Sequence, residues 1–75
     1  MNAMRMKYDA AADAAYIYVA DEIEPGAAVK CVPVDPLAIN GMINLDFDVE
    51  GRLLGIEVLA ASKRLPPEAL EAAER

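Results

Sequence analysis

Five residues of this sequence match the spacing of a calcium-binding loop. Asp46-x-Asp48-x-Glu50-Gly51, followed by Glu57, reproduces the first, third, fifth, sixth and twelfth positions of an EF-hand loop. An EF-hand requires a helix on each side, whereas the residues around this segment alternate between apolar and polar side chains, as β-strands do. We therefore favour an acidic β-hairpin exposed to solvent. Divalent-metal or small-ligand binding through Asp46, Asp48, Glu50 and Glu57 is the alternative.

The same acidic residues are the best candidates for acid–base catalysis. Asp46, Asp48 and Glu57 lie on one open sheet face if the strand register permits it, and glycosidase-type carboxylate pairs need a cleft and a separation of about 5 to 9.5 Å. A 75-residue β-rich chain offers little cleft. The sequence also contains no histidine, no Ser, Thr or Cys beside an evident base, and no glycine-rich phosphate loop. We therefore expect no enzyme activity, no catalytic residue and no cofactor.

Cys31 is the single cysteine, so an internal disulfide is excluded. A reactive thiol needs a group that lowers its pKa, and Cys31 sits among valines and a proline in a chain that has no histidine to do so. We expect Cys31 to be a small buried hydrophobic residue. Lys63 and Arg64 are most simply solvated charges near a helix end, or partners for the acidic face of a neighbouring subunit.

Two tyrosines, Tyr16 and Tyr18, share one face of the clearest strand pattern in the chain. Together with Tyr8 they can form an aromatic patch that contacts a partner, because tyrosine is enriched at protein interfaces. They can equally pack beneath the C-terminal helix. The sequence leaves both interpretations open, and Tyr16, Tyr18, Asp46 and Asp48 are the interaction candidates.

The elements that must position these side chains follow from periodicity and turn signals. Alternating or β-branched segments predict strands near residues 4–8, 14–20, 28–34, 43–48 and 52–59, and Pro67 opens a helix of about two turns. Gly51 predicts a tight hairpin, for which two registers are possible: a bulged turn pairs Phe47 with Leu53, and a two-residue loop places Leu45 opposite Leu54. The fold class is therefore α+β, an antiparallel β-meander of four to five strands with a short C-terminal helix.

Composition limits the size and partners of the protein. We expect one domain over residues 4–75, with residues 1–3 as a disordered N-terminus. The net charge of −6 and the pI of about 4.4 disfavour nucleic acid and anionic lipid as partners. The absence of a long apolar segment and of a secretory signal predicts a cytoplasmic protein that does not enter membranes.

The large apolar side chains are few, so the core is expected to be thin. A chain of this size rarely derives more than about 3–5 kcal/mol from its own core. We therefore expect a homo-oligomer, with a dimer favoured, that uses an exposed sheet face or edge. The acidic charge also permits a basic protein partner, and a non-enzymatic interaction module is the leading functional hypothesis.

Several segments in the same order resemble a known family. They are Met4-Arg5-Met6-Lys7-Tyr8-Asp9, the stretch 13–18, Asp46-Phe47-Asp48-Val49-Glu50-Gly51-Arg52, and Gly55-Ile56-Glu57 continuing into Ala61-Ser62-Lys63-Arg64-Leu65. They resemble the small prokaryotic domain-of-unknown-function family 2283 over residues 4–65, and the chain departs from the pattern at residues 31–41, which are longer and richer in proline. The resemblance implies a compact β-meander plus helix with no established activity or catalytic residue. It also implies an antitoxin-like partner role, because some such domains are encoded beside small toxin-like proteins.

Overall fold

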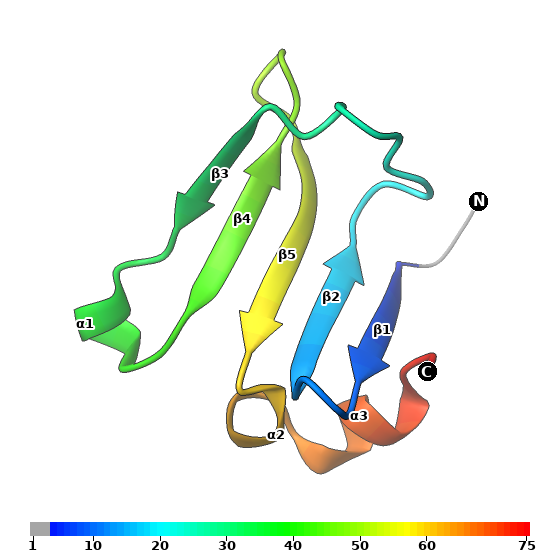
Figure 1. Ribbon diagram of the computed structural model, residues 1–75, viewed down its shortest axis with the longest axis vertical. Helices are drawn as coiled ribbons and strands as arrows, with labels where there is room; N and C mark the ends of the chain where they lie inside the picture. Colours follow the sequence, from blue (N-terminus) through cyan, green and yellow to red (C-terminus); the bar gives the residue numbers. More distant parts are fainter. Residues whose placement is uncertain (1–3) are drawn as a thin grey trace.

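The computed structural model describes residues 4–75, so the expected disorder of residues 1–3 lies outside the described residues. Five strands and three short helices follow one another along the chain (Figure 1). The strands are β1 (Arg5–Asp9), β2 (Ala14–Tyr18), β3 (Lys30–Pro33), β4 (Ile43–Phe47) and β5 (Leu53–Leu59). The helices are α1 (Pro36–Ile39), α2 (Ala61–Arg64) and α3 (Pro67–Ala72). None of the helices in residues 4–75 is long and apolar enough to cross a membrane.

All five strands form one antiparallel sheet in the order β1-β2-β5-β4-β3. The chain builds the hairpin β1-β2, crosses to the far edge of the sheet, and returns through β3, β4 and β5, so that β5 pairs with β2 in the centre (Figure 1). The predicted α+β meander with a helix starting at Pro67 is confirmed. The sequence did not predict α1 and α2 as helices, because one helical turn has the same local signals as a turn.

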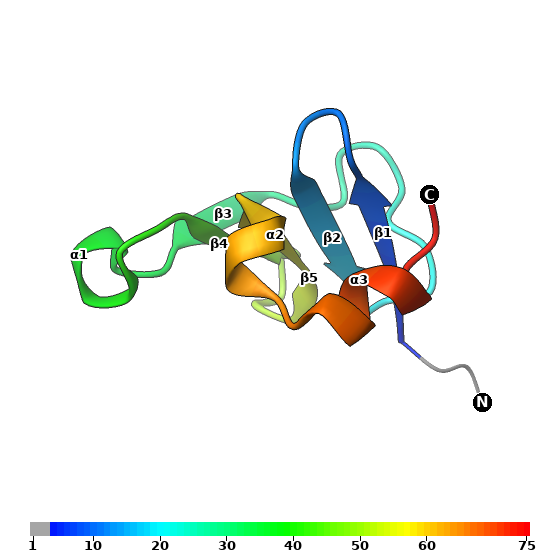
Figure 2. The ribbon, with the colours of Figure 1, turned by 90° about the horizontal axis from the view of Figure 1, so that it is seen from below.

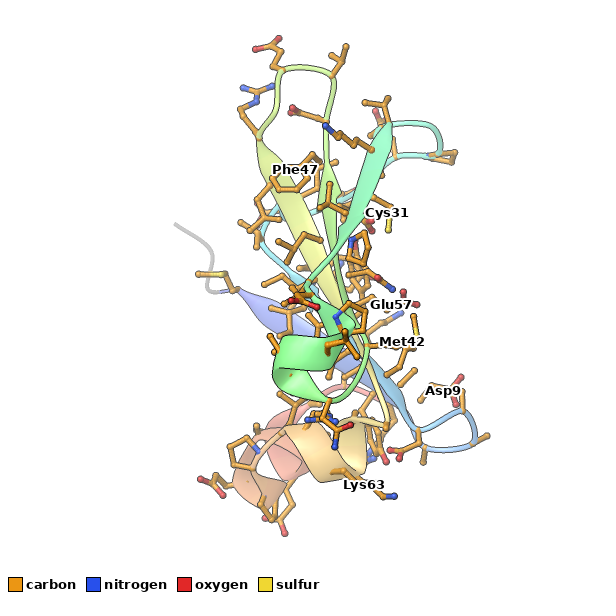
Figure 3. The ribbon with its side chains drawn as sticks, turned by 90° about the vertical axis from the view of Figure 1, so that its left-hand side faces the viewer. Asp9, Cys31, Met42, Phe47, Glu57 and Lys63 are labelled. Atoms are coloured by element: carbon orange, nitrogen blue, oxygen red, sulfur yellow. The ribbon has the colours of Figure 1, made fainter. Side chains whose placement is uncertain are left out.

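The two faces of the sheet differ in chemistry. The register places Met6, Ile17, Ile56 and Leu45 in a row across four strands, and Lys7, Tyr16, Glu57 and Asn44 in the next row. Successive side chains of a strand point to opposite faces, so these rows belong to opposite sides of the sheet. Figure 3 shows the two sides edge-on, with Phe47 on one and Cys31 and Glu57 on the other. We call them the apolar face and the polar face.

The β4–β5 hairpin adopts the bulged register. Phe47 lies opposite Leu53, while Asp46 lies opposite Gly55, which leaves Leu54 as the extra residue. The turn is closed by Asp48, whose Oδ1 accepts hydrogen bonds from the backbone N–H groups of Glu50 and Arg52. Gly51 has a φ of 81°, a conformation that L side chains rarely adopt.

The core is very small. Among residues 4–75, three hydrophobic side chains are fully buried: Ala15, Val58 and Ala61. Leu65 and Leu70 pack onto this cluster from the segment that contains α2 and α3. Figures 1 and 2 show α2 and α3 gathered at the end of the sheet where β5 leaves it, across β5, β2 and β1, while α1 lies apart beside β3 and β4. The helices therefore complete one half of the apolar face.

Asp13 attaches α2 to the first hairpin. Its carboxylate accepts hydrogen bonds from the Ser62 N–H at 2.9 Å, the Ser62 Oγ at 2.7 Å and the Tyr8 hydroxyl at 2.8 Å. The bonds from Ser62 in particular hold the pKa of Asp13 below its usual range, because they favour the charged form. The sequence did not predict this role of Asp13, because it depends on a contact with a residue 49 positions away.

The two edges of the sheet are protected in different ways. Along β1, the Tyr8 N–H donates to the Glu74 carbonyl oxygen, and the Glu74 N–H donates to Met6, so the C-terminal segment covers this edge. Along β3, Cys31 and Pro33 are the residues whose backbone faces away from β4, and proline has no N–H to donate. Neither edge offers a full row of free donors to another strand.

Candidate functional site

The polar face is organised around Tyr16. Its hydroxyl donates a 2.7 Å hydrogen bond to Asp46 Oδ2, which joins β2 to β4 over the central strand β5. The ring crosses Gly55, where a Cβ atom would collide with the Tyr16 side chain. Burial and the bond to Asp46 raise the pKa of Tyr16 well above its usual range, because both disfavour the phenolate. Tyr16 is therefore a fixed, neutral platform.

Tyr18 extends this aromatic platform toward β1. The rings of Tyr16 and Tyr18 meet edge to face, with their centroids 4.9 Å apart. The Arg5 guanidinium lies over the Tyr18 ring, 4.0 Å from its centroid, within the range of a cation–π interaction. Tyr8 is paired with Ala15 and lies on the apolar face, so it does not join the other two tyrosines.

A shallow hollow of about 200 Å³ adjoins the platform. It is lined by residues of β1, β2 and β5: Lys7, Asp9, Ala14, Ala15, Tyr16, Tyr18 and Glu57. Glu57 Oε1 accepts a 3.0 Å hydrogen bond from the Asn44 side chain, which holds the carboxylate in place. The hollow thus offers an aromatic wall with two carboxylates and one ammonium group around it.

The expectation that Cys31 is buried is wrong. The Cys31 side chain is exposed at the edge strand β3, on the polar face opposite Asp46 (Figure 3). Val32, the next residue, does not bury it, because successive side chains of a strand point to opposite sides. Hydrogen bonding to Asp46 raises the pKa of the thiol, and so disfavours the reactive thiolate.

The acidic hairpin does not bring its carboxylates together. The EF-hand spacing falls on β4, a turn and β5, so no helix flanks the loop within the described chain. Asp46 is bonded to Tyr16 on the polar face, whereas Asp48 binds its own turn and the Arg52 guanidinium at 2.9 Å. The bonds from Arg52 lower the pKa of Asp48. No group of three or more Cys, Asp or Glu side chains in residues 4–75 is placed to hold a metal ion.

The apolar face has an open groove of about 550 Å³ along β3 and β4. We call it the β3–β4 groove, and its lining consists of Val29, Lys30, Val32, Leu45, Phe47, Asp48, Val49 and Gly51. Val29 and Val49 are 59% and 82% exposed, which is unusual for valine. Sequence analysis did not single out Val29 and Val49, because their exposure depends on where the helices end.

A family model, described as a protein of unknown function (DUF2283), matches residues 5–62. The match covers more than half of the chain. The chain belongs to the DUF2283 family. The resemblance stated from the sequence motifs is thereby confirmed. No curated protein and no solved structure matches this chain.

The DUF2283 match includes all five strands and reaches Ser62, so both faces of the sheet and the contact between Asp13 and Ser62 lie within the family domain. Helix α3 and the segment that covers the β1 edge follow it. The polar platform and the β3–β4 groove are therefore features of the DUF2283 part of the chain.

Proposed function

We propose that this protein is a non-enzymatic interaction module that binds a basic protein through the polar face of its sheet. The observation that carries the proposal is the stacking of the Arg5 guanidinium on Tyr18. The face already accommodates an arginine of its own chain, and arginine side chains of a partner have the same chemistry.

Charge supports a basic partner over an acidic one. The chain carries a net charge of −6, which attracts cations over the distance of a Debye length, about 8–10 Å at physiological salt. At close range, Asp9 and Glu57 border the hollow beside Tyr16 and Tyr18, and their two negative charges outnumber the one positive charge of Lys7. A guanidinium in the hollow can stack on a tyrosine ring and at the same time donate hydrogen bonds to a carboxylate. A lysine ammonium has no planar group to stack, so it reproduces only part of this interaction.

The protonation of the polar face supports binding over catalysis. The Cys31 thiol and the Tyr16 hydroxyl both have raised pKa values, so neither is activated as a nucleophile or base near neutral pH. Asp46 accepts the Tyr16 hydrogen bond on an open sheet face instead of lining an enclosed pocket. These side chains are arranged to be rigid, as a docking surface requires.

The family resemblance gives this function a more specific form, an antitoxin-like role toward a small basic protein. The partner's arginines would occupy the hollow and neutralise Asp9 and Glu57. Divalent-metal binding by the acidic hairpin is the competing function, and calorimetry with Ca²⁺ and Mg²⁺ tests it directly.

The first experiment uses a defined probe, an arginine-rich peptide titrated into ¹⁵N-labelled protein. Its control is the same peptide with citrulline in place of arginine, which keeps the shape and removes the charge. We expect the arginine peptide alone to shift the backbone resonances of Tyr16, Tyr18 and Glu57. Glu57→Gln and Tyr18→Leu weaken the binding, whereas Glu68→Gln on α3, away from the polar face, leaves it unchanged. Equal shifts from both peptides would contradict the proposal.

A further inference from the structure

The β3–β4 groove is a second surface, on the opposite side of the sheet from the arginine site. Helices α2 and α3 lie beside β1, β2 and β5 and do not extend to β3 (Figures 1 and 2). The groove along β3 and β4 is open. Its apolar lining includes Val32, Leu45 and Phe47, together with Val29 and Val49, which are exposed. A cluster of apolar side chains this open, in a protein with three buried hydrophobic residues among those described, indicates an interface.

The chain exposes more surface than a compact protein of its mass. Its total accessible area is 5253 Å², whereas a compact monomer of 8.0 kDa exposes roughly 4,450 Å². The excess belongs to the chain as a whole, and an interface of standard size, which takes about 800 Å² from each partner, is large enough to cover it. The radius of gyration of 12.5 Å likewise exceeds the roughly 11 Å of a compact 75-residue domain.

The groove carries charges of both signs in positions suited to a two-fold interface. Lys30 lines it and makes no salt bridge within residues 4–75. Val49 and Gly51 line the groove, and Glu50 lies between them at the tip of the hairpin. The 3.8 Å contact between Glu50 and Arg52 is exposed to solvent. Asp48 also lines the groove, but its carboxylate is bonded to Arg52. In a two-fold dimer a residue i that contacts j of the partner is matched by j contacting i, so Lys30 and Glu50 allow this surface to complement itself.

We propose that the β3–β4 groove binds a second copy of this chain, as a two-fold dimer in which Val29, Phe47 and Val49 pack against the same residues of the partner and Lys30 pairs with the partner's Glu50. The dimer is formed by faces and not by edges, because Glu74 covers β1 and Pro33 interrupts β3. It leaves the polar face free, so dimerisation and arginine binding are independent and either can fail alone.

The first test is sedimentation equilibrium of the full chain. We expect the wild type to be a dimer at micromolar concentration. Val29→Asp places a carboxylate in the interface and raises the dissociation constant by at least about a hundredfold. The matched control is Leu37→Asp, at an apolar residue on α1 that is 93% exposed and does not line the groove, and it leaves the dimer intact. A monomeric wild type, or equal effects of the two variants, would overturn the proposal.

The second test is a charge exchange, and it holds even if Val29→Asp perturbs folding. Lys30→Glu and Glu50→Lys each weaken the dimer, since each places like charges in contact. The two single variants mixed together form a heterodimer, because both contacts then join opposite charges. The double variant Lys30→Glu/Glu50→Lys regains the wild-type constant for the same reason. Failure of both the mixture and the double variant to recover the dimer would exclude this pairing and the two-fold arrangement.

Discussion

The Tyr16 hydroxyl and the Asp46 carboxylate are joined by a 2.7 Å hydrogen bond that spans the central strand β5. The bond is possible because Gly55, beneath the Tyr16 ring, has no side chain. The aromatic platform of the polar face is therefore fixed by a glycine that lies directly opposite Asp46, on the strand between Asp46 and Tyr16. This relationship gives the first prediction.

Gly55→Ala is expected to destabilise the fold by about 1–3 kcal/mol, because the new Cβ collides with the Tyr16 ring and displaces it from Asp46. Urea unfolding measures the loss. The same substitution in a Tyr16→Ala background is expected to cost much less, since the ring is gone. Equal costs in the two backgrounds would show that the contact between Gly55 and Tyr16 does not constrain the sheet.

Cys31 is expected to react slowly with iodoacetamide for an exposed thiol, because the hydrogen bond and the negative charge of Asp46 raise its pKa. Asp46→Asn lowers the pKa toward its ordinary value, and the alkylation rate at pH 8 increases. The control is Tyr16→Phe, which removes the hydrogen bond to Asp46 but leaves its charge, and the thiol stays slow. A pH–rate profile that is the same in Asp46→Asn and in the wild type would contradict this explanation.

Asp13 makes the stability of the protein depend on pH. Its pKa in the folded state lies below the ordinary value of 3.8, so its contribution is complete above that pH and is lost as the pH falls through the lower folded value. We expect Asp13→Asn to lower the free energy of unfolding at pH 7, and the difference from the wild type to shrink near pH 3. The pKa of Asp48 is also lowered, so the stability of the Asp13→Asn variant still depends on pH through Asp48. A difference that is constant from pH 7 to pH 3 would show that the charge of Asp13 is unimportant.

Arg5 occupies the surface that a partner's arginine is proposed to use. Its guanidinium lies on Tyr18 and donates to the Asp21 carbonyl oxygen at 3.1 Å. Arg5→Ala frees the ring and removes a positive charge, so we expect the arginine peptide to bind several-fold more tightly. Isothermal titration calorimetry measures the constant. Weaker binding would show that Arg5 forms part of the site instead of competing for it.

The strands of this fold could be predicted from the sequence because they depend on local alternation. Ile43, Leu45 and Phe47 alternate with polar residues, and Gly51 specifies a turn, so both strands of this hairpin were predicted. The strand register was not predicted. Pairing Phe47 with Leu53 requires a bulge at Leu54, and that bulge depends on the packing of the whole sheet and not on the local sequence. Alternation also placed Tyr16 and Tyr18 on one face, but it does not say which strands lie beside them.

The parts of the candidate site that sequence could not predict all depend on strand order. Cys31 was expected to be buried from its valine neighbours, and its exposure follows from its position on an edge strand. The contact between Arg5 and Tyr18 needs the β1–β2 register, and the β3–β4 groove exists because α2 and α3 end before they reach β3. Helix α1 was not predicted, because four residues carry no helical periodicity.

The central claim is that the polar face of the sheet binds arginine side chains of a basic partner. Its most direct test is the map of resonance shifts when the arginine peptide is added to the labelled wild-type protein. We predict saturable shifts concentrated at Tyr16, Tyr18 and Glu57 that disappear with the citrulline peptide and diminish as salt is raised. Shifts spread evenly over acidic residues of the chain, including Glu68 and Glu71 on α3, would contradict the claim, because they would reflect net charge and not a site.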